Sequence, residues 1–178
     1  MPVPSKVSGR AKIAGGVLLV LGLWGALVPF IGPSFGYGMG GVGAWTWTES
    51  HATLHLAPGV AAIVGAIFLL LGRSTSQTFG SLLAMVGGIW FVIAPSLHPL
   101  WAGQSMAGMN GMGDSVPSSA LSALGYHYGT GVLIAIVGAY TFGVLGHGRS
   151  APTGDVRSES RRPNPVGATD STLVGAQN

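Results

Sequence analysis

The sequence predicts an all-α membrane protein, with four transmembrane helices arranged as two tandem helical hairpins. Three observations support this fold class. First, only 7% of the 178 residues are charged and 48% are hydrophobic, whereas about 25% of an ordinary soluble domain is charged. Second, four apolar stretches are long enough to cross a bilayer. Third, these stretches share short motifs in pairs, at nearly constant spacing.

The four apolar stretches define the expected helices. A spanning helix needs roughly 20 mostly apolar residues, and residues 11–32, 52–72, 79–99 and 121–146 meet this length. None of them contains Asp, Glu or Arg, and their only lysine, Lys12, lies at an end. The first stretch is longer than the roughly 7–15-residue core of a signal peptide, and no cleavage motif follows it, so we expect it to be retained.

The positive charges predict the orientation. All eight Lys and Arg residues lie before residue 13, in the segment 73–78, or after residue 146. The loops 33–51 and 100–120 contain none. The positive-inside rule therefore predicts a multi-pass protein of the plasma (inner) membrane, with both termini in the cytoplasm and the two long loops outside. The positive-inside distribution also explains why basic residues outnumber acidic ones, so no nucleic-acid partner is needed to account for this excess.

Three regions follow from this orientation. Residues 1–10 form a cytoplasmic N-terminus, and residues 11–146 form the transmembrane domain. Residues 147–178 are rich in Ser, Pro, Gly and Arg and contain no Phe, Trp or Tyr. Such a composition does not bury enough apolar surface to fold, so we expect a disordered cytoplasmic tail.

An internal duplication divides the transmembrane domain. The motif G-x-W-x4-P begins at Gly22 and again at Gly88, an offset of 66 residues. The motif H-x3-G-V begins at His55 and again at His127, an offset of 72 residues. The chain therefore contains two repeats, 11–72 and 79–146. Both enter from the cytoplasm, so the repeats are parallel and a pseudo-two-fold axis runs along the membrane normal.

The repeated motif resembles the SPW repeat, which occurs in one or two copies in small bacterial membrane proteins. The resemblance covers most of residues 11–146, and similar four-span proteins of uncharacterised function are common in actinobacteria. The sequences around Pro29 and Pro95 are Val-Pro-Phe and Ala-Pro-Ser rather than Ser-Pro-Trp. His55 and His127 stand where the repeat has asparagine. The resemblance implies the four-helix fold and carries no established activity.

The repeated residues also have a structural interpretation. Pro29 and Pro95 leave the carbonyls of the residues four positions earlier, Gly25 and Phe91, without a donor. In hydrocarbon a neighbouring group has to supply one. A histidine on the next helix is such a donor, while the glycines of the motifs are expected to allow close helix packing.

Histidines gather at the predicted outer border, and three hypotheses account for them. They are structural hydrogen-bonders, or they bind a metal, or two of them bind haem. Imidazole and thioether groups suit copper, and the candidate metal ligands are His51, His55, His98, Met106, Met109 and Met112. In the third hypothesis His55 and His127, at equivalent repeat positions, are axial ligands of one haem iron.

The composition favours a function without catalysis. The absence of cysteine excludes a disulfide scaffold and cysteine-ligated metal sites, and no nucleophile motif is present. We expect a non-enzymatic structural or interaction component of the membrane, with lipid, a second copy or another membrane protein as partner. The alternatives are a copper- or haem-binding protein and a transporter of small solutes or ions that acts as an oligomer.

Overall fold

A computed structural model describes residues 6–38, 42–102 and 123–147. The described part of the chain is helical and contains no strand. Four helices are long and apolar enough to cross a membrane, so the coarse fold prediction is confirmed. The predicted tail lies outside the described residues except for His147, and most of the loop 100–120 lies outside them too.

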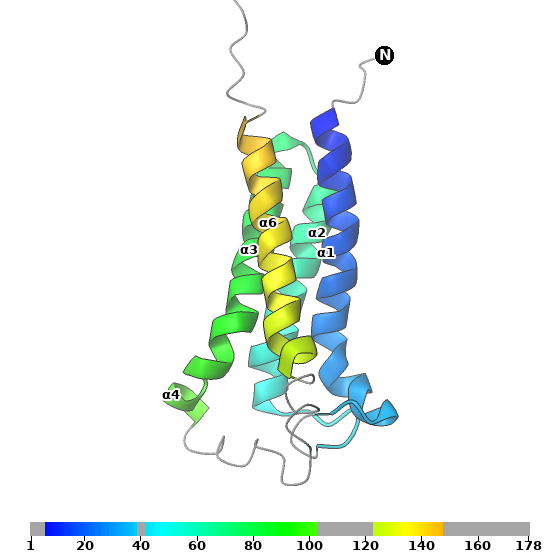
Figure 1. The fold of residues 1–178 in the computed structure, drawn as a ribbon, viewed down its shortest axis with the longest axis vertical. Coiled ribbons are helices and arrows are strands. Elements are labelled where there is room, and N and C mark those ends of the chain that lie inside the picture. Colours follow the sequence, from blue (N-terminus) through cyan, green and yellow to red (C-terminus); the bar gives the residue numbers. More distant parts are fainter. Residues whose placement is uncertain (1–5, 39–41, 103–122, 148–178) are drawn as a thin grey trace, which may run out of the picture.

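The helices form a closed four-helix bundle (Figure 1). Helix α1 (Lys6–Ile31) packs along α2 (Ala57–Leu71), and α2 packs along α3 (Ser74–Leu97). Helix α3 packs along α6 (Gly129–His147), which also contacts α1. Each long helix therefore contacts its neighbours in chain order, and the first and last helices close the ring.

The two ends of the bundle differ (Figure 1). The terminal end carries the start of α1, the α2–α3 connection and the end of α6. The opposite end, here called the histidine end, carries the 3₁₀ turn η1 (Gly32–Phe35), the π-helical segments η2 (His51–Leu56) and η4 (Leu124–Tyr128), and the short helix α4 (Pro99–Ala102).

The connection at the terminal end is shorter than the sequence predicts. The predicted helices 52–72 and 79–99 leave residues 73–78 between them, but α3 begins at Ser74 and only Gly72 and Arg73 separate it from α2. The reason is Gln77, which is buried and whose Nε2 donates to the carbonyl oxygen of Leu69 at 3.0 Å. This polar side chain satisfies a C-terminal carbonyl of α2, so it belongs inside the bundle.

Each of the second and fourth spans begins with a π-helical segment, which the sequence does not predict. Segment η2 contains His55 and segment η4 contains His127, the two histidines of the repeated motif. A π-helical turn carries one extra residue, which alters the backbone pairing locally. The irregular backbone therefore occurs at equivalent positions in the two half-sequences.

The motif glycines lie at helix–helix contacts, as predicted. A Cβ atom at Gly59 would lie 2.8 Å from the backbone nitrogen of Ala26. A Cβ atom at Gly131 would lie 2.8 Å from the carbonyl oxygen of Gly88. Because these neighbours are backbone atoms, only glycine permits this approach. The fully buried ring of Phe91 fills the bundle centre.

These contacts predict different effects for the same substitution at two positions of α6. Gly131→Ala places a methyl group against α3, and we expect it to lower the free energy of unfolding by about 1–3 kcal/mol. Gly143→Ala has no atom within 4 Å of its new methyl group, so we expect it to be neutral or stabilising by up to about 1 kcal/mol. Unfolding in mixed detergent micelles, followed by circular dichroism, measures both. Equal stability of the two variants would contradict the proposed close packing.

Candidate functional site

The histidine end buries three imidazole rings. His55, His98 and His127 are exposed by only 4%, 3% and 3%. The Nδ1 atom of each is buried and has no hydrogen-bond partner among the described residues. Buried polar atoms are usually paired, so these three nitrogens are the most unusual feature of the described structure.

His55 and His127 form a close, tilted pair of rings. Their ring centroids are 4.3 Å apart, with 34° between the ring planes. The rings of Tyr126 and Phe91 approach His55 edge-on, with centroids at 5.7 and 6.2 Å. Two positions that the sequence separates by 72 residues are thus in direct contact at the centre of the bundle.

The other ring nitrogen of His55 forms a hydrogen bond with the backbone of helix α1. The backbone of Gly25 forms a hydrogen bond with the His55 imidazole. Since Nδ1 has no partner, the nitrogen involved is Nε2. The Gly25 carbonyl is the acceptor that Pro29 leaves without its helical donor. This bond is the one that the structural hypothesis for His55 expects.

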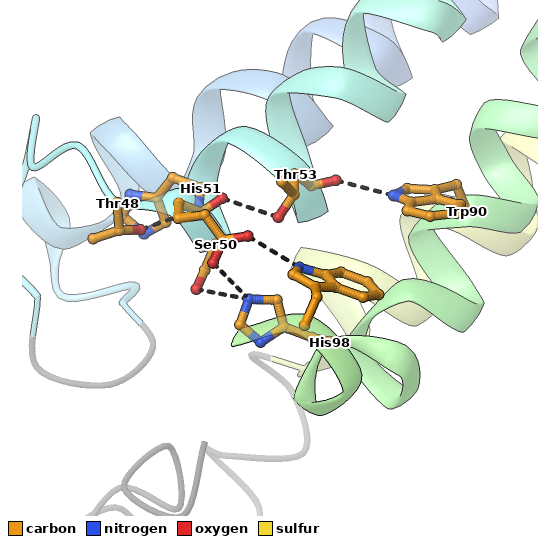
Figure 2. Close-up of polar contacts among 8 residues, drawn as sticks. Thr48, Ser50, His51, Thr53, Trp90 and His98 are labelled. Atoms are coloured by element: carbon orange, nitrogen blue, oxygen red, sulfur yellow. Dashed lines mark hydrogen bonds and ion pairs between the residues drawn. The ribbon is translucent and has the colours of Figure 1, made fainter. Parts of the chain in front are cut away.

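Two tryptophans form reciprocal bonds between the half-sequences. Trp24 Nε1 donates to the carbonyl oxygen of Gly125 at 3.2 Å, and Trp90 Nε1 donates to that of Thr53 at 3.0 Å (Figure 2 shows the latter). Thr53 and Gly125 lie within η2 and η4, each two residues before the motif histidine. Each G-x-W-x4-P motif thus contacts the π-helical segment of the other half.

Two tyrosines attach the end of α1 to η4. The Tyr126 hydroxyl donates to the carbonyl oxygen of Tyr37 at 2.6 Å and contacts that of Val28 at 3.4 Å. The two rings lie 5.1 Å apart. Burial raises the pKa of the Tyr37 phenol above its usual value of 10.0, so this side chain is neutral at physiological pH. Neither tyrosine is predicted from the sequence to be a site residue, although Tyr126 directly precedes His127.

His98 belongs to a separate polar cluster with the segment just before η2 (Figure 2). Its Nε2 lies 3.4 Å from Glu49 Oε2 and 3.3 Å from Ser50 Oγ. Trp101 Nε1 donates to Glu49 Oε1 at 3.0 Å. Glu49 therefore connects the loop before η2 to the segment that follows α3.

The predicted metal ligands are not assembled into one group. His51 Nδ1 bonds to the carbonyl oxygen of Thr46 at 2.8 Å, and its ring lies 6.2 Å from that of His55. Among residues 6–38, 42–102 and 123–147, no three His, Cys, Asp or Glu side chains are placed to hold a metal. Met106, Met109 and Met112 lie outside the described residues.

The arrangement of His55 and His127 also differs from the predicted haem ligation. Metal–nitrogen bonds are about 2 Å long, so two imidazoles on opposite sides of one iron have ring centroids about 6 Å apart. The observed separation between His55 and His127 is 4.3 Å. As placed here, the two rings do not leave room for a porphyrin between them.

The reciprocal tryptophan bonds generate a stability prediction. Trp24→Phe and Trp90→Phe keep an aromatic ring but remove the indole donor. The Thr53 carbonyl then loses the donor from Trp90, whereas the Gly125 carbonyl keeps the Thr130 hydroxyl as a donor at 2.7 Å. We expect Trp90→Phe to lower the free energy of unfolding in detergent by about 1 kcal/mol and Trp24→Phe to lower it by less. Trp47→Phe is the control, since Trp47 is exposed, and we expect little change. The proposed role of the bonds would be wrong if all three variants had the same free energy of unfolding as the wild type.

Comparison of the chain with models of known protein families, with curated proteins and with solved structures finds no match. The SPW-repeat resemblance therefore stays a prediction, and the geometry of the histidine end is the basis for a function.

Proposed function

We propose that the protein is a non-enzymatic integral component of the bacterial plasma membrane that packs against a second copy or another membrane protein. The reciprocal bonds from Trp24 to Gly125 and from Trp90 to Thr53 carry this proposal. In these bonds the indole N–H groups of the motifs donate to backbone carbonyls within the bundle. A motif used in this way stabilises a compact transmembrane unit.

The same bonds support two parallel repeats, 11–72 and 79–146, related by a pseudo-two-fold axis. Trp24 and Trp90 are equivalent under the offset of 66, and Thr53 and Gly125 are equivalent under the offset of 72. Exchange of the two halves therefore converts one bond into the other. The paired π-helical segments and the contact between His55 and His127 support the same relation.

The orientation in the membrane follows from charge. The described Lys and Arg residues lie at the terminal end of the bundle: Lys6, Arg10, Lys12 and Arg73. Cytoplasmic segments next to spanning helices carry an excess of Lys and Arg. We therefore place the terminal end, with both chain termini, in the cytoplasm and the histidine end at the outer surface.

The orientation is tested by labelling single cysteines in intact cells, and the absence of native cysteine makes each variant unambiguous. Gly40→Cys and Asn110→Cys are expected to react with a membrane-impermeant maleimide. Ser76→Cys and Ser160→Cys are expected to react only after the cells are permeabilised. Labelling of positions 40 and 110 on opposite sides would contradict the parallel repeats.

The packing role is tested by photocrosslinking within native membranes. A photoreactive phenylalanine analogue replaces Ile13, Val20, Ile136 or Tyr140, whose side chains point away from the bundle. The same analogue at the fully buried Ile134 is the control. We expect at least one exposed position to form a protein adduct of defined mass, which mass spectrometry identifies as a second copy or a partner. Lipid adducts alone at all four positions would contradict the proposal.

A further inference from the structure

The segment between η1 and η2 exposes two tryptophans at the histidine end. Trp45 and Trp47 are exposed by 66% and 69%, and both rings lie beside the buried ring of Phe30, with centroids at 6.4 and 5.0 Å. We infer that these two indoles form a lipid-binding surface, which holds the segment in the ester and headgroup layer of the bilayer leaflet at the histidine end. The inference rests on the spanning helices proposed above, but not on the orientation of the bundle or on its packing partner.

The backbone places Trp45 at the border of the hydrocarbon layer. Its N–H donates to the carbonyl oxygen of Phe30 at 3.0 Å. Phe30 follows Lys12 by 18 residues in α1, which is about 27 Å at a rise of about 1.5 Å per residue. The hydrocarbon core of a bilayer is about 30 Å thick. Since Lys12 is an exposed charge at one border of this layer, Phe30 and Trp45 lie next to the other border.

The segment is held in place at both ends. Beyond the bond to Phe30, the carbonyl oxygen of Thr46 bonds to Nδ1 of His51 at 2.8 Å, and the backbone N–H of His51 donates to Thr48 Oγ1 at 3.0 Å. Trp45 has a φ of 60°, a left-handed conformation that side chains other than glycine rarely adopt. Such conformations occur preferentially at functional sites. A tryptophan at a position that favours glycine therefore indicates a role for the exposed indole itself.

The indole N–H groups of the two residues distinguish them from the other tryptophans. Trp24, Trp90 and Trp101 each donate Nε1–H to an oxygen atom of the protein. Nε1 of Trp45 and Nε1 of Trp47 have no hydrogen bond to any described residue.

Phospholipid supplies what these two side chains lack. Tryptophan is enriched where membrane meets water, because its ring is apolar and its N–H needs an acceptor. Ester carbonyl and phosphate oxygens accept the N–H, while the upper part of the acyl chains contacts the ring. Residues 42–48 contain no charged side chain, so no charge opposes their contact with this layer.

The depth of each indole is measured by ¹⁹F NMR on the full-length chain in phosphatidylcholine bicelles. Biosynthetic 5-fluorotryptophan labels all five tryptophans, and the signals lost in Trp45→Phe and in Trp47→Phe assign these two. Lipids that carry a spin label near the ester carbonyls or near the chain ends, and a paramagnetic chelate confined to water, then broaden each signal according to its depth.

Matched references come from exposed positions near the middle of two spans. Val20→Trp in α1 and Ile136→Trp in α6 each add one signal, at positions that are exposed in the bundle. These references report whether the helices are inserted in the bilayer, independently of the segment that carries Trp45 and Trp47.

We expect the signals of Trp45 and Trp47 to be broadened at least about twofold more by the label near the ester carbonyls than by the label near the chain ends or by the chelate. The two references are expected to show the reverse order for the two lipid labels. Both phenylalanine variants keep a ring beside Phe30, so we expect them to fold, which helical content and gel filtration establish. Trp45→Tyr assigns the signal if Trp45→Phe does not fold.

Three results would overturn the inference while the references still respond to the lipid labels, and would leave the spanning helices unaffected. Strongest broadening by the chelate would place the segment in water. A profile equal to that of the references would place it within the hydrocarbon. No broadening by any of the three agents would mean that protein, such as a second copy, covers the indoles. References that respond to neither lipid label would instead contradict the spanning helices, and the inference with them.

Discussion

The pairing of backbone carbonyls in a medium without water is the constraint on which this structure depends. Two prolines and two π-helical segments leave acceptors unpaired near one end of the bundle. Hydrocarbon offers no donor to replace them. Side chains of neighbouring helices donate to three of these acceptors: Nε2 of His55 bonds to Gly25, and the indoles of Trp24 and Trp90 bond to Gly125 and Thr53 in the π-helical segments. These three polar side chains of the spans therefore bond one helix to another.

The arrangement makes the two halves dependent on each other. A hairpin formed by α1 and α2 alone would keep the bond between His55 and Gly25, but it would lose the donor for Thr53, which comes from α3. The hairpin of α3 and α6 would lose the indole donor to Gly125, which comes from α1, and would keep only the Thr130 hydroxyl there. The relation is not symmetric at every position. Gly25 of the first half corresponds to Phe91 of the second, and the ring of Phe91 lies against Gly25.

The sequence predicts the number of spans, the glycine contacts and the donor role of His55, because each depends on local chemistry: apolar length, small volume, or a proline four residues after a carbonyl. It does not predict the π-helical segments, the inclusion of Gln77 in α3 or the position of Tyr126. Those features depend on which helix lies opposite, and that information is absent from any single stretch. The separation of His98 from His55 has the same origin, because Glu49 and Ser50 hold His98 in a different cluster.

The pairing of the Gly25 carbonyl by His55 is tested most directly by a distance measurement between His55 and helix α1 in lipid. Solid-state NMR of protein labelled with ¹⁵N in histidine and ¹³C at the Gly25 carbonyl reports their dipolar coupling. We expect strong coupling between Nε2 of His55 and the Gly25 carbonyl carbon, with the proton on Nε2 and an unprotonated Nδ1. Absence of this coupling, or a proton on Nδ1 instead, would show that His55 does not pair the Gly25 carbonyl.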